Sequence, residues 1–132
     1  MSVSEDRPRP RPSDRLAGDE RLLDIPATLA ALRAEGTPGA QGHRQIALLH
    51  QPSLRLVLFA FEAGGRIKEH SAAGWVTIHV LRGTLLVRTA TTRHTLRIGM
   101  LLSLAPGVKH DVEASEQSDM LLGISPEQAV VT

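Results

Sequence analysis

Nine short stretches with alternating apolar and polar residues follow one another from residue 44 to residue 124. A period of two places every second side chain on the same face, which is typical of β-strands with one buried face. Glycine, proline and serine separate the stretches and favour turns. Without a helical pattern between them, strands at this spacing predict an all-β sandwich or closed barrel. The predicted strands span residues 44–50, 54–62, 66–70, 75–82, 84–90, 93–97, 100–104, 108–114 and 118–124.

One short helix is expected before the strands, at about residues 25–35. Asp24 is suited to cap it, and Pro26 is suited to its first turn. Apolar residues then recur at a spacing of three and four before Gly36. This apolar stripe is too narrow to form a core alone, so we expect the helix to lie over the outside of the strands.

Residues 1–19 alternate arginine with proline at their centre, a composition that favours solvated, extended conformations. We expect a disordered tail, with an arginine-rich arm that touches RNA or an acidic partner as the alternative. Residues 20–132 are then expected to form a single domain. Their bulk composition agrees, because 42% hydrophobic and 22% charged residues are ordinary values for a globular protein.

Charge and composition exclude several classes of function. The net charge is +1, and the predicted domain has no basic run that would neutralise phosphates, so no nucleic-acid partner is expected. Three aromatic residues are too few for a base-stacking platform. The absence of cysteine excludes disulfides and thiolate metal sites. The longest apolar run, residues 56–61, is far shorter than the roughly 18 residues of a membrane helix, so we expect a cytoplasmic protein without a membrane partner.

Two stretches, residues 64–83 and residues 99–114, resemble the paired sequence motifs of the cupin family. The resemblance implies a cupin-type double-stranded β-helix, or jelly-roll barrel, of the small single-domain kind. Such domains are often homodimers, so a homodimer is expected here as well. In this family the two motifs together supply the ligands of a metal ion.

The first stretch keeps part of its motif, which runs Gly, five residues, His-x-His, three or four residues, Glu, six residues and Gly. Gly64, His70 and Gly83 match it. Ala72 stands in place of the second histidine, and Val76 stands in place of the glutamate. Two of the four family ligands are therefore replaced by side chains that cannot coordinate a metal.

The second stretch matches its motif more closely. That motif runs Gly, five residues, Pro-x-Gly, two residues, His, three residues and Asn, and Gly99, Gly107 and His110 fit it. Ala105 and Ala114 depart from it. All the matching glycines fall between predicted strands, where a turn can require a positive φ angle.

The strand period predicts which side chains face into the barrel. Residues two apart share a face, so a register that points His70 inward on one strand and His110 inward on another places two imidazoles in an otherwise apolar interior. Around them we expect a ligand pocket lined by Ala72, Trp75, Val76, Ile78 and Val112, with Trp75 near the barrel mouth.

Metal binding by His70 and His110 is a hypothesis with a clear alternative. Glu69 and Asp111 each adjoin a histidine and lie on the opposite wall unless a β-bulge reverses them. His79 faces outward and is a weak third candidate ligand, which a strand twist or bulge would have to bring inward. Two imidazoles suit one divalent transition metal, namely zinc, nickel, copper or iron. In the alternative, the pair holds no metal and is bonded to itself, to water or to a ligand.

Three functions are compatible with this sequence. The first is a small-molecule-binding domain, in which the two histidines fix the polar end of a small organic ligand. The second is a metal-dependent enzyme, a dioxygenase, isomerase or lyase as the family resemblance implies. The third is a dimeric scaffold or regulatory sensor domain, which uses outer-face residues such as His79 and Val87 against a second subunit. No catalytic residue is predicted.

Overall fold

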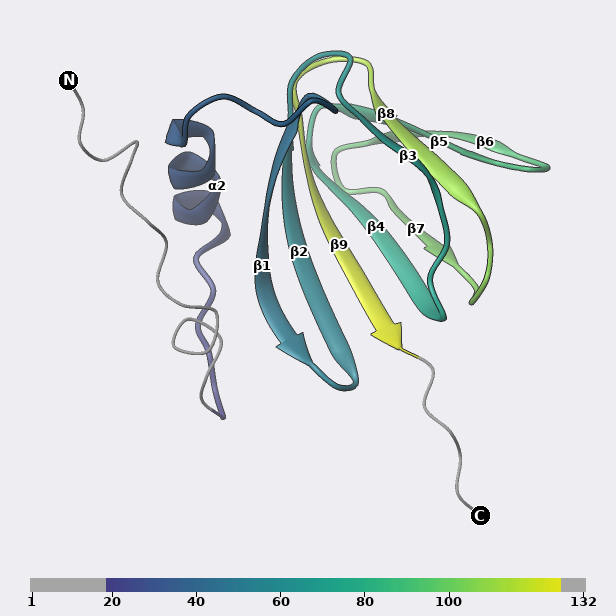
Figure 1. Ribbon diagram of the computed structural model, residues 1–132, viewed down its shortest axis with the longest axis horizontal. Helices are drawn as coiled ribbons and strands as arrows, with labels where there is room; N and C mark the ends of the chain where they lie inside the picture. The colour runs from purple at the N-terminus through teal and green to yellow at the C-terminus, as the bar shows by residue number, and fades with distance from the viewer. Residues whose placement is uncertain (1–18, 127–132) are drawn as a thin grey trace.

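The computed structural model describes residues 19–126 and contains two antiparallel β-sheets that face each other, with one helix outside them (Figure 1). The larger sheet has the strand order β1-β2-β9-β4-β7, and the smaller has the order β3-β8-β5-β6. The bounds are α2 (Ile25–Ala34), β1 (His43–Gln51), β2 (Leu54–Phe61), β3 (Arg66–His70), β4 (Gly74–Arg82), β5 (Thr84–Thr89), β6 (Arg93–Arg97), β7 (Leu101–Leu104), β8 (His110–Ala114) and β9 (Ser118–Pro126).

This arrangement confirms the predicted all-β fold. All nine predicted strands are present, and their ends differ from the prediction by no more than two residues. Consecutive strands repeatedly lie in different sheets, as when β3 of the smaller sheet is followed by β4 of the larger, which is the connectivity of a jelly roll. Residues 1–18 of the predicted disordered tail lie outside the described residues.

The helix also forms where it was expected. The side chain of Asp24 accepts a hydrogen bond from the Ala27 amide at 3.0 Å, and a proline stands in the first turn. Leu32 is buried against the larger sheet, and α2 lies over β1 and β2 at the edge of that sheet (Figure 1). Over residues 19–126, no helix is long and apolar enough to cross a membrane.

The space between the sheets is filled by aliphatic and aromatic side chains from both inner faces. In β4 the buried residues alternate strictly with partly exposed ones, as the period of two predicts. The core comprises Phe59, Phe61, Val76, Ile78, Val80, Leu85, Val87, Leu96, Leu104, Val112, Ala114, Met120 and Leu122. Val87 is completely buried in this core, so its predicted position on the outer face is wrong.

The glycines of the two cupin-like motifs occupy turns that require them. Gly64, Gly83, Gly99 and Gly107 all have φ between 81° and 84°. At Gly83 the space is closed as well, because a Cβ there would lie 2.2 Å from the Ser118 hydroxyl. The motif glycines are thus explained by backbone geometry.

Candidate functional site

The structure brings His70 and His110 together at the ends of two paired strands. They are directly opposite residues of the antiparallel strands β3 and β8, and their ring centroids are 4.2 Å apart. A β-bulge in β3 lies between Ile67 and His70, where the register shifts by one residue. Because Ile67 already faces the core, this extra residue allows His70 to face inward as well.

Both rings are oriented by hydrogen bonds to the backbone. Nδ1 of His70 lies 2.9 Å from the Lys68 carbonyl oxygen, and Nδ1 of His110 lies 3.0 Å from the Val108 carbonyl oxygen. A carbonyl oxygen only accepts hydrogen bonds, so each Nδ1 carries the hydrogen and donates it. In the neutral imidazole, Nε2 is then an unprotonated acceptor.

The bonds to these two carbonyl groups were not predicted from the sequence. The rings were expected to bond to each other, to water or to a ligand, whereas each ring bonds to the backbone oxygen of the residue two positions before it in the sequence. A strand period predicts the face on which a side chain lies and carries no signal for a bond of this kind.

His110 is the more deeply buried member of the pair. Its residue is 1% exposed, and Nε2 is buried without a hydrogen-bond partner. Burial lowers the pKa of His110 from 6.5, and the nearby His70 lowers it further; the hydrogen bond to Val108 and the charge of Asp111 only partly oppose this shift. His110 is therefore neutral at pH 7 and presents a bare lone pair.

The predicted pocket residues divide into two groups. Val76, Ile78 and Val112 belong to the packed core and are at most 3% exposed. Ala72 is partly buried and packs against this core. Trp75 is 54% exposed, and the strand alternation places it on the face opposite Val76. Four of the five predicted lining residues are therefore aliphatic and lie in the core or against it, while Trp75 faces away from the interior.

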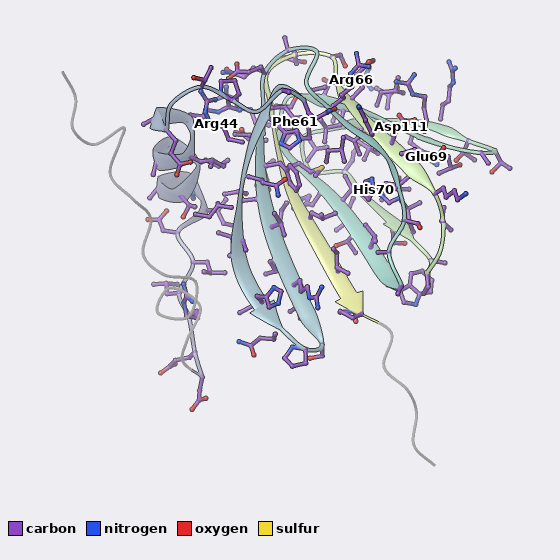
Figure 2. All side chains as sticks on the ribbon, viewed as in Figure 1. Arg44, Phe61, Arg66, Glu69, His70 and Asp111 are labelled. Carbon is purple, nitrogen blue, oxygen red and sulfur yellow. The ribbon has the colours of Figure 1, made fainter. Side chains whose placement is uncertain are left out.

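Glu69 and Asp111 remain on the outer side of the smaller sheet, although β3 has a bulge. Figure 2 shows His70 in the space between the sheets, with Glu69 and Asp111 on the other side of β3 and β8. Glu69 is exposed, and the Asp111 carboxylate accepts a 3.0 Å hydrogen bond from Nε of Arg88. The bulge places Lys68 and Glu69 together on the solvent side and brings no carboxylate to the histidines.

His79 lies away from the pair. It alternates with the buried Ile78 and Val80 in β4, so its side chain faces the outer side of the larger sheet. Within residues 19–126, no group of three or more His, Cys, Asp or Glu side chains could hold a metal ion. The His70–His110 pair therefore does not fit a metal centre with three protein ligands.

His43 is a partly buried histidine at the start of β1. Its ring packs edge-on against Phe59 and Phe61 at centroid distances of 5.2 and 5.5 Å. Its Nδ1 is buried without a partner, and burial lowers its pKa from 6.5. This histidine therefore packs against two aromatic residues of the core.

No protein family model and no curated protein matches the sequence. Solved structures do match its fold. A conserved protein from Streptococcus pyogenes is 18% identical, with a TM-score of 0.68, and the match covers 87% of this chain and 94% of that chain. A cupin superfamily protein from Desulfitobacterium hafniense is 16% identical, with a TM-score of 0.66, covering 86% of this chain and 96% of that chain.

A further match is a variant of salicylate 1,2-dioxygenase from Pseudoaminobacter salicylatoxidans, solved in complex with gentisate. It is 18% identical, with a TM-score of 0.62, and the match covers 76% of this chain and 30% of that longer chain. Identities this low establish the architecture and leave the chemistry open. The described part of the chain therefore has the cupin jelly-roll fold.

Proposed function

We propose that this domain binds a small organic molecule at the end of the barrel where His70 and His110 meet. The observation that carries the proposal is the Nε2 atom of His110, which is buried and has no hydrogen-bond partner. A buried polar atom without a partner costs free energy, about 1–3 kcal/mol for an uncharged group. A bound molecule that hydrogen-bonds to this atom would remove that cost.

The aliphatic surroundings support an organic ligand. Ala72 and Val108 are partly buried and pack against the core, and Val112 is buried on the same face of β8 as His110. Ligand sites commonly combine an apolar lining with a few polar groups that fix orientation, and the two imidazoles are suited to this role. His70 is only partly buried, so a ligand could reach the pair from solvent.

A metal-dependent enzyme, such as a dioxygenase, isomerase or lyase, is the second candidate. The two Nε2 acceptors favour it, since neutral imidazole is a common metal ligand, and a dioxygenase is among the matching structures. Against it, alanine and valine stand at the two remaining ligand positions of the family motif. We give it second place because it needs further donors near the pair, and residues 19–126 form no group of three or more that could hold a metal ion.

Elemental analysis of protein purified without an affinity tag separates the two candidates. Binding of an organic ligand predicts substoichiometric zinc, nickel, copper and iron, at the same level in the wild type and in the His70→Ala, His110→Ala double variant. Stoichiometric metal that disappears in the double variant would overturn the proposal in favour of the enzyme. His50→Ala is the matched control, because this histidine is exposed on β1.

We also propose that the partner of this chain is a second copy, bound through the outer face of β4 and β7. His79 pairs with Leu101 on one side and with Leu121 on the other, and Leu101 is 57% exposed. These side chains carry no acidic group, so a two-fold axis could bring the face against itself without opposing carboxylates. Analytical ultracentrifugation should show a dimer that Leu101→Glu disrupts. Leu54→Glu, at an exposed leucine that begins β2, should leave the dimer intact.

A further inference from the structure

We propose that the polar end of the ligand is a hydrogen-bond donor on an uncharged molecule, such as a ring N–H or a hydroxyl group. This inference rests on the binding function proposed above and narrows its ligand class. It follows from the hydrogen bond that Nδ1 of each ring already makes to a backbone carbonyl oxygen.

Both Nδ1 hydrogens are committed to the protein. The Lys68 and Val108 carbonyl oxygens accept them at 2.9 and 3.0 Å, which is normal hydrogen-bond length. A ligand acceptor could gain an Nδ1 hydrogen only by breaking one of these bonds and leaving a carbonyl group without its partner. The pair therefore has no spare donor in its neutral form.

Two acceptors are left, the Nε2 atoms of rings whose centroids are 4.2 Å apart. The rings make no hydrogen bond to each other, and Nε2 of His110 is partnerless and buried. Neither neutral nitrogen can satisfy the other, since both are acceptors. A donor introduced from outside would satisfy an acceptor that the described residues leave unpaired.

Anions are disfavoured at the same place. Burial opposes the charged form of His110, so this ring is not a ready source of positive charge at neutral pH. Arg66 and Arg88 lie on the outer side of the smaller sheet. There Arg88 forms ion pairs with Asp111 and Glu113, and Arg66 forms one with Glu113. A carboxylate or phosphate at the histidines would therefore find no cation on the inner side of β3 and β8.

The packed core between the sheets limits the size of the ligand. Val76, Ile78 and Val112 are at most 3% exposed and fill the interior. The partly buried Ala72 stays at the edge of this core, where the Ala72 carbonyl accepts a 2.9 Å hydrogen bond from the Gly107 amide and ties two loops together. The molecule should therefore be small, with one donor directed at the histidines and an apolar body.

Pyrrole and furan form a matched pair of probes for this inference. The rings have nearly the same shape, but pyrrole carries an N–H donor where furan carries an oxygen. We would measure both dissociation constants by protein NMR titration at pH 7.5. Pyrrole should bind about five- to tenfold more tightly, the effect of one added hydrogen bond, although furan is the more hydrophobic ring.

His110→Leu removes the buried acceptor and replaces the imidazole with an apolar side chain of similar size. In this variant the preference for pyrrole should fall to about one, while weak binding of furan persists or improves. His50→Leu, at an exposed histidine of β1, should keep the wild-type preference. Amide spectra of both variants would establish that they are folded.

The outcomes distinguish this inference from the function on which it rests. Equal binding of pyrrole and furan to the wild type, or a preference that survives in His110→Leu, would overturn the donor inference and leave small-molecule binding in place. No perturbation of residues around His70 by either probe at millimolar concentration would overturn both. Tighter binding of acetate than of pyrrole would also overturn the donor inference, because it requires a positively charged pair.

Discussion

His70 and His110 are directly opposed across β3 and β8, and each ring donates its Nδ1 hydrogen to a carbonyl oxygen two residues earlier in its own chain. The same hydrogen bond from ring to backbone thus occurs once on each strand of the antiparallel pair. Its consequence is a fixed tautomer at both positions, which leaves two Nε2 acceptors side by side.

The tautomers can be observed directly. We expect ¹⁵N NMR spectra at pH 7.5 to show a protonated Nδ1 and an unprotonated Nε2 for both histidines. On titration, the pKa of His110 should lie below 6.5, since burial and His70 both lower it. In His70→Ala the pKa of His110 should rise, because a nearby ring that lowers it is gone and water gains access. An Nε2-protonated His110 at neutral pH would contradict the assignment of both lone pairs.

The lowered pKa of His110 also makes stability depend on pH. Well above pH 6.5 the ring is neutral in both the folded and the unfolded chain, so its contribution is constant. Below pH 6.5 the unfolded chain binds a proton that the folded chain resists, so the free energy of unfolding should fall as pH drops towards the folded-state pKa. The slope is at most about 1.4 kcal/mol per pH unit for each such histidine.

His110→Leu isolates this contribution. Urea denaturation at pH 7.5 and pH 5.5 should show a smaller loss of stability in the variant than in the wild type. Some pH dependence should remain, because burial also lowers the pKa of His43. An unchanged pH dependence in His110→Leu would mean that His110 does not stay neutral in the folded protein.

The period of two was sufficient to predict most of the fold. It fixed the positions of nine strands within two residues, and it placed Val76 and Ile78 inside and His79 outside. This works because one side of each strand is buried, so a shift of one residue would expose the whole apolar set. Val87 was the exception, since its predicted outer position conflicts with its complete burial.

The site was predictable only in part. The motif spacing brought His70 and His110 together, but it could not reveal the bulge between Ile67 and His70, because an inserted residue has no sequence signature of its own. The bonds from the rings to Lys68 and Val108 depend on backbone direction at the strand ends. The tautomers could be assigned only from the three-dimensional structure.

Gly83 and Gly64 provide a test of the motif glycines. Both have φ near 80°, but a Cβ at Gly83 would lie 2.2 Å from the Ser118 hydroxyl, whereas a Cβ at Gly64 meets nothing within 4 Å. Gly64→Ala should therefore cost only the backbone term, about 1–2 kcal/mol. Gly83→Ala should cost clearly more, because the chain around Ser118 must move as well. Equal losses in thermal denaturation would contradict the close packing at Gly83.

The contact between Arg33 and Asp119 should anchor the helix to the barrel. The Arg33 guanidinium also donates to the Ser118 carbonyl at 3.1 Å, and the Asp119 side chain is only 5% exposed. Arg33→Met leaves a buried carboxylate with only the more distant Arg82, so we expect a loss of about 3 kcal/mol in chemical denaturation. Adding Asp119→Asn should recover part of that loss. Additive effects of the two substitutions would show that the pair does not interact.

Val76→Glu tests whether Val76 occupies the position of the glutamate ligand in the cupin motif. Val76 is 3% exposed within the core, so an unpaired carboxylate there should destabilise the protein by several kcal/mol at pH 7.5. If position 76 adjoins the two Nε2 acceptors, the new carboxylate completes a set of three ligands, and excess zinc should raise the melting temperature again. Val80→Glu is the matched control, because it buries a carboxylate two inward positions further along β4 and should gain nothing from zinc. Equal behaviour of the two variants would place position 76 out of reach of the pair.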